Sequence, residues 1–319
     1  MKFAYLCEDG TKITVEGNTL LVKKGKETIA QLPINLLKSI LVFGNSQATT
    51  DALSRLTRRG IRIAWLSRTG KLKFYVAGPE NFAINKIRQH HCYLDKEKRL
   101  RIAREVFERK VYSQVFFLKN YFREIKEKGS FLEDAENLLE KSRSSRSLDE
   151  IRGYEGFLSR KYFELLKQVV KNQHFRFEGR KYHPCTDRFN CALSLAYGFC
   201  KQVICSAIVA SGFDPFIGFL HEFTSSKEAF VYDMIEEFRP YVDWRVIKMI
   251  NKKQLKEDMF LIESGGEVKI CPKHFKAVVC LYHEQIIAFE EPRYGIPFYE
   301  AVGQSIELIS NHIKEVYGS

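Results

Sequence analysis

The sequence lacks the paired cysteines of a structural zinc site. Its eight cysteines are scattered and none forms a Cys-x-x-Cys pair, which excludes a zinc ribbon and fits the reduced thiols of a cytoplasmic protein. A secretory hydrophobic region is also missing from the start of the chain. The longest apolar run, residues 203–210, is shorter than the about 20 residues of a membrane span. We therefore expect a cytoplasmic protein with no membrane segment, in which this run lies in a core helix.

Sequence motifs for nucleotide and hydrolase chemistry are missing as well. Gly70-Lys71 is followed by Leu72 and Gly25-Lys26 by Glu27, so no Walker A sequence is present. Gly-x-Gly-x-x-Gly, Gly-x-Ser-x-Gly and His-Glu-x-x-His are also absent. ATP-driven work, dinucleotide redox chemistry and serine hydrolysis are therefore unsupported.

Positive charge and aromatic residues are abundant instead. The 319 residues include 51 Lys and Arg against 39 Asp and Glu, 25 Phe and 15 Tyr. This length suggests two domains, and the apolar content can bury a substantial core. The charge excess favours a polyanionic partner such as nucleic acid, although solvated lysine faces produce the same balance.

The spacing of hydrophobic residues changes once along the chain. Residues 1–78 contain short alternating or apolar runs separated by turns, with one helix after Thr49, which predicts a β-rich domain. Residues 79–85 are a predicted linker. Residues 86–319 have a period of about 3.6 and predict a larger, all-helical domain. The predicted fold class is therefore α+β with two domains.

One histidine and two acids could form a small metal site. His221 follows Gly218-Phe219-Leu220, and Asp233 and Glu236 are spaced i and i+3. On a helix these carboxylates would share one face and need a cation to offset their repulsion. Hard divalent cations prefer such oxygens, and a neutral imidazole can complete the site. The alternative is that His221 is an ordinary boundary residue and Arg239 pairs with the acids.

A third acid, Glu155, lies between Gly153 and Gly156 in a predicted helix. Each glycine costs a helix about 1 kcal/mol relative to alanine, which suits a position where a ligand approaches closely. An exposed glutamate near a kink has the same pattern.

Basic segments could bind DNA. The loop at residues 180–190 combines cations with an aromatic ring, which suits phosphates and unpaired bases, although a capped loop explains it nearly as well. The basic helical tract at residues 86–128 projects Arg101 and Lys110 among other cations, as a solvated amphipathic helix would.

Motifs from nearly the whole chain follow the order and spacing of one known family. They are Ile40-Leu41-Val42-Phe43-Gly44, Thr49-Thr50-Asp51-Ala52-Leu53, Gly60-Ile61, Leu66-Ser67-Arg68-Thr69-Gly70, Tyr154-Glu155-Gly156, residues 187–194 with Tyr197, Gly218-Phe219-Leu220-His221 and residues 233–243. With these motifs the chain resembles the CRISPR-associated integrase and endonuclease family, whose catalytic subunit inserts new spacers into CRISPR arrays.

The resemblance implies a site for Mg²⁺ or Mn²⁺. Its ligands would be Glu155, His221 and Glu236, which would also be the catalytic residues, with Asp233 as a neighbour or alternative ligand. Glu236 stands where the family often has Asp, and Glu237 where Pro is common. The basic and aromatic residues suggested for DNA binding are Arg180, Arg188, Arg239, Arg245, Lys248 and Tyr197, with Lys110 and Arg101 as weaker candidates.

The resemblance also implies a reaction and an assembly. The expected reaction joins 3′-hydroxyl ends of spacer DNA to repeat edges by transesterification, with DNA endonuclease activity besides, on double-stranded and branched DNA. The N-terminal domain would form a homodimer, the C-terminal domain would be catalytic, and two dimers would flank a small ferredoxin-like partner in a heterohexamer. Two alternatives remain. The first is a nuclease or branched-DNA resolvase that uses water as the nucleophile, and the second is a non-catalytic DNA-binding scaffold.

Overall fold

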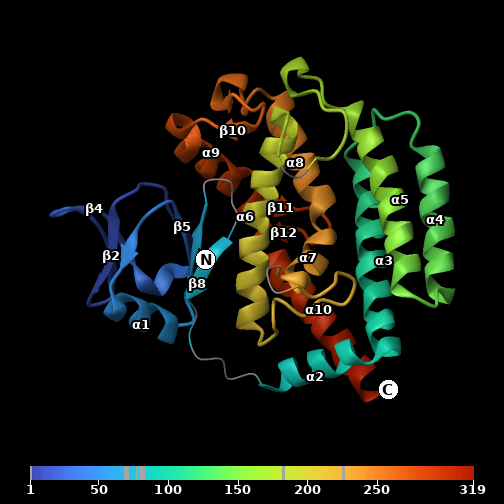
Figure 1. The fold of residues 1–319 in the computed structure, drawn as a ribbon, viewed down its shortest axis with the longest axis horizontal. Helices are drawn as coiled ribbons and strands as arrows, with labels where there is room; N and C mark the ends of the chain where they lie inside the picture. Colours follow the sequence, from blue (N-terminus) through green and yellow to red (C-terminus); the bar gives the residue numbers. More distant parts are fainter. Residues whose placement is uncertain (1, 68–71, 77, 79–82, 182–183, 225–226) are drawn as a thin grey trace. The chain divides into compact units, whose positions relative to one another are not determined.

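The computed structural model has an α+β fold, as the sequence predicts, with a β-rich N-terminal region followed by a helical C-terminal region (Figure 1). It describes all residues except 1, 68–71, 77, 79–82, 182–183 and 225–226. Parts of the predicted linker, of the motif at residues 66–70 and of the loop at residues 180–190 lie outside the described residues. The chain divides into two compact units, Met1–Asn81 with Pro272–Cys280, and Phe82–Cys271 with Leu281–Ser319.

Two four-stranded sheets make up most of the first unit, with strand orders β1-β5-β7-β8 and β4-β3-β2-β6. Their strands are β1 (Lys2–Leu6), β2 (Thr11–Glu16), β3 (Thr19–Lys24), β4 (Glu27–Pro33), β5 (Leu37–Phe43), β6 (Gln47–Ala48), β7 (Arg62–Leu66) and β8 (Leu72–Val76). The predicted helix is α1 (Thr50–Arg58), which begins where the Thr49 hydroxyl accepts a hydrogen bond from the Ala52 N–H. Ala52 and Leu56 on its inner face join the buried cluster that includes Ile13 and Ile40.

The second unit is mainly helical. Its helices are α2 (Ala83–Leu94), α3 (Lys96–Asn120), α4 (Gly129–Ser144), α5 (Leu148–Lys167), α6 (Arg188–Ala210), α7 (Ala229–Glu236), α8 (Arg239–Asn251) and α10 (Phe298–Gly318). Helix α9 (Phe275–Tyr282) lies mostly in the segment Pro272–Cys280 of the first unit, although this segment falls within the range 86–319 predicted for the second domain. Two short ladders complete the chain, β9 (Phe260–Ile262) with β10 (Val268–Ile270), and β11 (Glu290–Glu291) with β12 (Ile296–Pro297).

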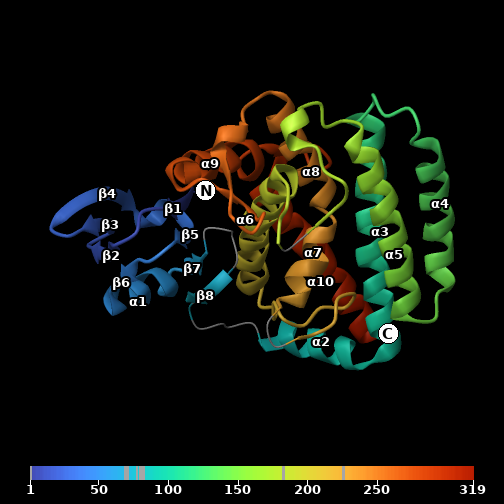
Figure 2. The same ribbon diagram turned by 45° about the horizontal axis from the view of Figure 1, so that its top comes forward.

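Helix α6 of the second unit contains the apolar run 203–210 and packs against α7, α8 and α10. Among the described residues it alone is long and apolar enough to cross a membrane, and 78% of its most apolar window is buried. A core helix passes the same test of length and composition, so α6 is the core helix that the sequence predicts. Helices α3, α4 and α5 lie side by side in both views (Figures 1 and 2). Helix α3 also packs against α7, and these contacts bring α5 and α7 together across α3.

Candidate metal centre

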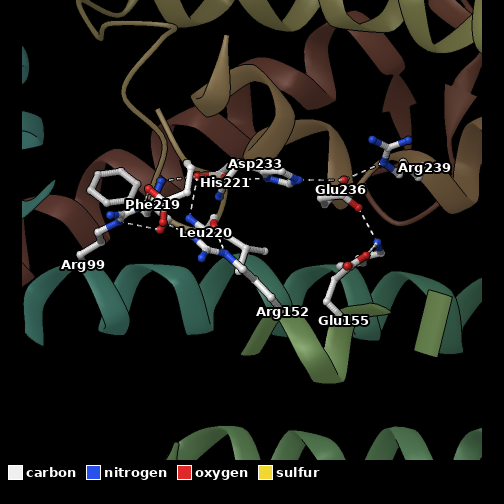
Figure 3. Close-up of polar contacts among 11 residues, drawn as sticks. Arg99, Arg152, Glu155, Phe219, Leu220, His221, Asp233, Glu236 and Arg239 are labelled. Atoms are coloured by element: carbon white, nitrogen blue, oxygen red, sulfur yellow. Dashed lines mark hydrogen bonds and ion pairs between the residues drawn. The ribbon is translucent and has the colours of Figure 1, made fainter. Parts of the chain in front are cut away.

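Asp233 organises the loop that carries His221. Its carboxylate is 1% exposed, on α7. Oδ2 accepts hydrogen bonds from the N–H groups of Phe219 and Leu220 at 2.5 and 3.2 Å. Oδ1 accepts from the N–H and the ring Nδ1 of His221 at 2.9 and 2.8 Å (Figure 3). Because a carboxylate only accepts, Nδ1 carries the proton and Nε2 is left as the metal-binding or proton-accepting atom.

Two arginines hold the same loop from outside. Arg99 Nε donates to the Phe219 carbonyl at 3.0 Å, and Arg152 donates to the Leu220 carbonyl at 2.9 and 2.8 Å. Both guanidinium groups also pair with Glu222, at 3.0 and 2.6 Å. Asp233 of α7 thus binds the N–H groups of Phe219 and Leu220, while Arg99 of α3 and Arg152 of α5 bind their carbonyls. Contacts to three helices therefore fix the position of His221.

Gly218 is required by a close approach at the start of the loop. A Cβ at this position would lie 2.7–2.9 Å from the backbone and Cβ of Ala229, the first residue of α7. No side chain fits in this space without moving the backbone. The glycine of the Gly218-Phe219-Leu220-His221 motif therefore sets the distance between the loop and α7.

Glu236 lies at the end of α7 in a cationic environment. Its side chain is 4% exposed; Oε1 is 2.7 Å from Arg239 Nε and 4.0 Å from His221 Nε2, and Oε2 is 2.5 Å from Lys110 Nζ. Burial alone would raise its pKa, but Arg239, Lys110 and His221 outweigh burial and lower the pKa to about 2. Glu236 is therefore ionised at neutral pH.

Glu155 approaches the same point from α5. Its Oε1 accepts hydrogen bonds from Lys110 Nζ and from the Ser159 hydroxyl, the latter at 2.8 Å. With 26% exposure its side chain is the open edge of the site. The helix continues through Gly153 and Gly156, and a Cβ at either would meet nothing within 4 Å. Gly153 and Gly156 lie two residues before and one residue after Glu155, so their open positions are on other faces of α5 than the Glu155 side chain.

Lys110 of α3 joins the two carboxylates. Its buried ammonium contacts both Glu155 and Glu236. Desolvation would lower the pKa of Lys110, but the ion pairs with Glu236 and Glu155 prevail and raise it. Lys110 thus lies between the predicted ligands Glu155 and Glu236, and the Nε2 of the third, His221, is 4.0 Å from Glu236 Oε1.

The side chains of Glu155, Glu236 and His221 are of the types that bind a hard divalent ion, although the two carboxylates are spaced by their ion pairs with Lys110. Among the residues described, no three His, Cys, Asp or Glu side chains are close enough to hold a metal as they stand. Two carboxylates and an imidazole with a free Nε2 are nevertheless the ligand types that Mg²⁺ and Mn²⁺ accept. Asp233 does not belong to this set, because its four hydrogen bonds engage both of its oxygens.

The candidate DNA-binding residues divide by burial. Tyr197 is 4% and Arg245 1% exposed. The Tyr197 hydroxyl donates to buried Asp243, and the Arg245 guanidinium donates to the carbonyl and side chain of Gln285 and lies 3.5 Å from the Phe289 ring centroid. Neither side chain is placed to reach a phosphate, so burial removes both from the proposed interface.

The remaining candidates are more accessible. Arg180 and Arg239 lie over the Tyr197 ring at 5.4 and 4.7 Å, and Arg239 also pairs with Glu236. Arg188 donates to the His174 carbonyl at 3.4 Å, and Lys248 lies over the Trp244 ring at 4.9 Å. Of the weaker candidates, Arg101 is exposed and donates to the Ser319 hydroxyl, whereas Lys110 lies inside the carboxylate site.

Sequence reasoning missed the roles of Arg99, Arg152 and Glu222, and placed Lys110 among the surface cations. No motif identifies them, because their partners lie 45 to 126 residues away in the chain for Lys110 and 68 to 123 for the two arginines. The one signal in the sequence that could have indicated the role of Lys110 was its position on the apolar side of a basic helix.

Comparison with known proteins identifies the relatives of this chain. A profile of the family described as CRISPR associated protein Cas1 matches residues 4–284. The "CRISPR-associated endonuclease Cas1 4" of Methanospirillum hungatei is 30% identical over 282 residues, which are 88% of this chain and 78% of that protein.

Solved structures share the fold. A Cas1 protein from Thermotoga maritima superposes with a TM-score of 0.84 at 22% identity, over 98% of this chain and 97% of that one. A casposase bound to integration product has a TM-score of 0.83 at 24% identity, over 99% and 91%. A chain of a Cas6-RT-Cas1–Cas2 complex has a TM-score of 0.82 at 21% identity, over 98% of this chain and 35% of its own length.

Proposed function

The chain belongs to the Cas1 family of CRISPR-associated endonucleases and integrases, and from this membership we propose that it joins the 3′-hydroxyl ends of new spacer DNA to the edges of CRISPR repeats by transesterification. It is a nuclease or integrase enzyme, and its reaction needs no nucleotide energy source because one phosphodiester bond is exchanged for another. The observation that carries the proposal is the contact of the Lys110 ammonium with both Glu155 and Glu236, with His221 Nε2 4.0 Å from Glu236 Oε1.

We assign Glu155, His221 and Glu236 as ligands for Mg²⁺ or Mn²⁺. The ion, when bound, supplies positive charge at the scissile phosphate and lowers the pKa of the attacking hydroxyl. Glu236 is held ionised by Arg239, His221 presents Nε2 because its Nδ1–H donates to Asp233, and Glu155 lies at the accessible edge. Asp233 is a positioning residue.

Arg180, Arg188, Arg239 and Lys248 are the proposed contacts to the DNA backbone, since phosphate contacts fix the position of a duplex without reading its sequence. The likeness to a casposase bound to integration product and to a chain of a Cas1–Cas2 complex supports double-stranded or branched DNA and a small CRISPR-associated partner as the ligands. We further propose a cytoplasmic homodimer through the β-rich region, residues 1–78, that completes a heterohexamer with this partner, while residues 86–319 form the catalytic domain.

Strand transfer in vitro tests the reaction. Short duplex DNA with free 3′-hydroxyls is mixed with a supercoiled plasmid carrying a leader and repeat, Mn²⁺ or Mg²⁺, and the small partner. We expect joining that is lost with EDTA, with a 3′-deoxy donor, and in Glu155→Ala and His221→Ala.

Two matched variants serve as controls. Glu164→Ala removes an exposed acid from the same helix as Glu155, and His174→Ala removes an exposed histidine; both should join DNA at the wild-type rate. Joining by Glu155→Ala would show that the metal site is wrongly assigned. Cleavage without joining, with the partner present, would favour a hydrolytic nuclease, as the relative from Methanospirillum hungatei is named.

A further inference from the structure

We infer that Lys110 is an internal competitor of the catalytic metal: its ammonium holds Glu155 and Glu236 in the metal-free enzyme and must leave before a divalent ion can bind. The inference rests on the proposed function, because it takes Glu155 and Glu236 as ligands. It concerns the concentration of metal at which the site fills.

The position of the ammonium carries the inference. Lys110 Nζ is 2.5 Å from Glu236 Oε2 and also contacts Glu155 Oε1. Mg²⁺ binds carboxylate oxygens at about 2.0–2.1 Å, so an ion shared by these two oxygens would take the place that the nitrogen now fills. One nitrogen and one metal ion cannot both lie between the same pair of oxygens.

Charge leads to the same conclusion. Lys110 and Arg239 together match the charges of Glu155 and Glu236, and the remaining charge is that of Asp233 beside the neutral His221 ring. A divalent ion added beside a retained ammonium would leave an excess positive charge among side chains that are 4 to 26% exposed. Uncompensated charge is costly in such surroundings, and withdrawal of Lys110 relieves it.

The competition has a measurable consequence. If the carboxylates are free of the ammonium in about 1–10% of molecules, the apparent metal affinity is about 10- to 100-fold weaker than that of the open site. Lys110 thereby keeps the carboxylates in place without metal and raises the metal concentration needed for activity.

Titration of Mn²⁺ by calorimetry tests the inference on the purified full chain. We expect Lys110→Met to bind Mn²⁺ about tenfold or more tightly than wild type, and half-maximal DNA cleavage to require correspondingly less Mn²⁺. Lys110→Gln should behave alike, so the test does not depend on one variant folding. Lys161→Met is the matched control, because Lys161 also pairs with a carboxylate, Asp134, away from the site; it should bind as wild type does.

The outcomes separate the inference from the proposed function. Unchanged or weaker binding in both folded Lys110 variants, with binding lost in Glu155→Ala, would overturn the inference and leave the metal site standing. Wild-type binding by Glu155→Ala would remove the metal site and the inference together.

Discussion

Replacing Asp233 with asparagine should destabilise the second unit while changing one atom. The carboxylate accepts two hydrogen bonds at each oxygen, from the N–H groups of Phe219, Leu220 and His221 and from the His221 ring. Asparagine has one oxygen, and its amide is itself a donor. Whichever way the amide lies, two donors face an NH₂ group instead of an acceptor, either the buried N–H groups of Phe219 and Leu220 or the half-buried N–H and ring of His221.

The size of the effect follows from these orphaned donors. Each buried group left without its partner costs about 1–3 kcal/mol, so two of them predict a loss of about 2–6 kcal/mol. For a unit of this size about 1 kcal/mol lowers Tm by roughly 2–4 °C. We therefore expect Tm to fall by about 5–15 °C, which corresponds to the middle of the expected loss in the free energy of unfolding.

Thermal unfolding followed by circular dichroism measures the loss, and NMR titration of the histidine rings adds a local readout. Burial alone lowers the His221 pKa, but its hydrogen bond and charge interaction with Asp233 raise it above the usual value; in Asp233→Asn this pKa should fall. Asp149→Asn is the control, because Asp149 is 90% exposed on α5. A Tm within about 1 °C of wild type, together with an unchanged His221 pKa, would refute this account of Asp233.

Two further predictions concern buried charges. Burial raises the pKa of Asp243 to about 7 despite the hydrogen bond from Tyr197. The stability that the protonated Asp243 carboxyl contributes is therefore full below the unfolded pKa and is lost as pH rises through about 7. Asp243→Asn should therefore match wild type near pH 4 and gain up to about 4 kcal/mol on it by pH 8; equal pH dependence of unfolding in the two proteins would contradict this. Arg245→Met should lower Tm yet keep DNA affinity within about twofold, because its side chain is buried. Arg188→Met should weaken DNA binding several-fold without that fall in Tm. A binding titration in which Arg245→Met loses affinity and Arg188→Met does not would place Arg245 on the interface.

The β-rich region was predictable where each strand has a buried side. In β2, buried residues alternate with exposed or half-buried ones, and β5 and β7 are almost wholly buried; both patterns are visible in the sequence. No buried face marks strand β4 in the sequence, because it lies at the edge of its sheet and has no buried residue. Its hydrogen bonds to β3 hold it in place, and backbone pairing leaves no hydrophobic period in the sequence.

The helical region was predictable in period and less so in its breaks. The basic tract at residues 86–128 keeps a helical pattern throughout, yet the helix is interrupted at Asp95, whose side chain accepts hydrogen bonds from the Glu97 and Lys98 N–H groups and starts α3. In a stretch with many charged residues, the sequence alone does not distinguish Asp95, which caps a helix, from an aspartate on a helix surface. Hydrophobic spacing predicts which face is buried and does not by itself predict where an axis changes direction.

Motifs in the sequence suggest the proposed ligands Glu155, His221 and Glu236, but they do not predict which cations contact these side chains. Lys110 and Arg239 have equal charge and both contact Glu236, yet Arg239 lies three residues from Glu236 and Lys110 lies 126 away. The nearer cation is one that the sequence suggests as a partner for the acids. Only packing of α3 against α5 and α7 makes the distant lysine the bridge between Glu155 and Glu236. The bridge that Lys110 forms is therefore a property of tertiary structure, and variants of Lys110 probe it in a way that variants of the proposed ligands, which would remove the carboxylates themselves, cannot.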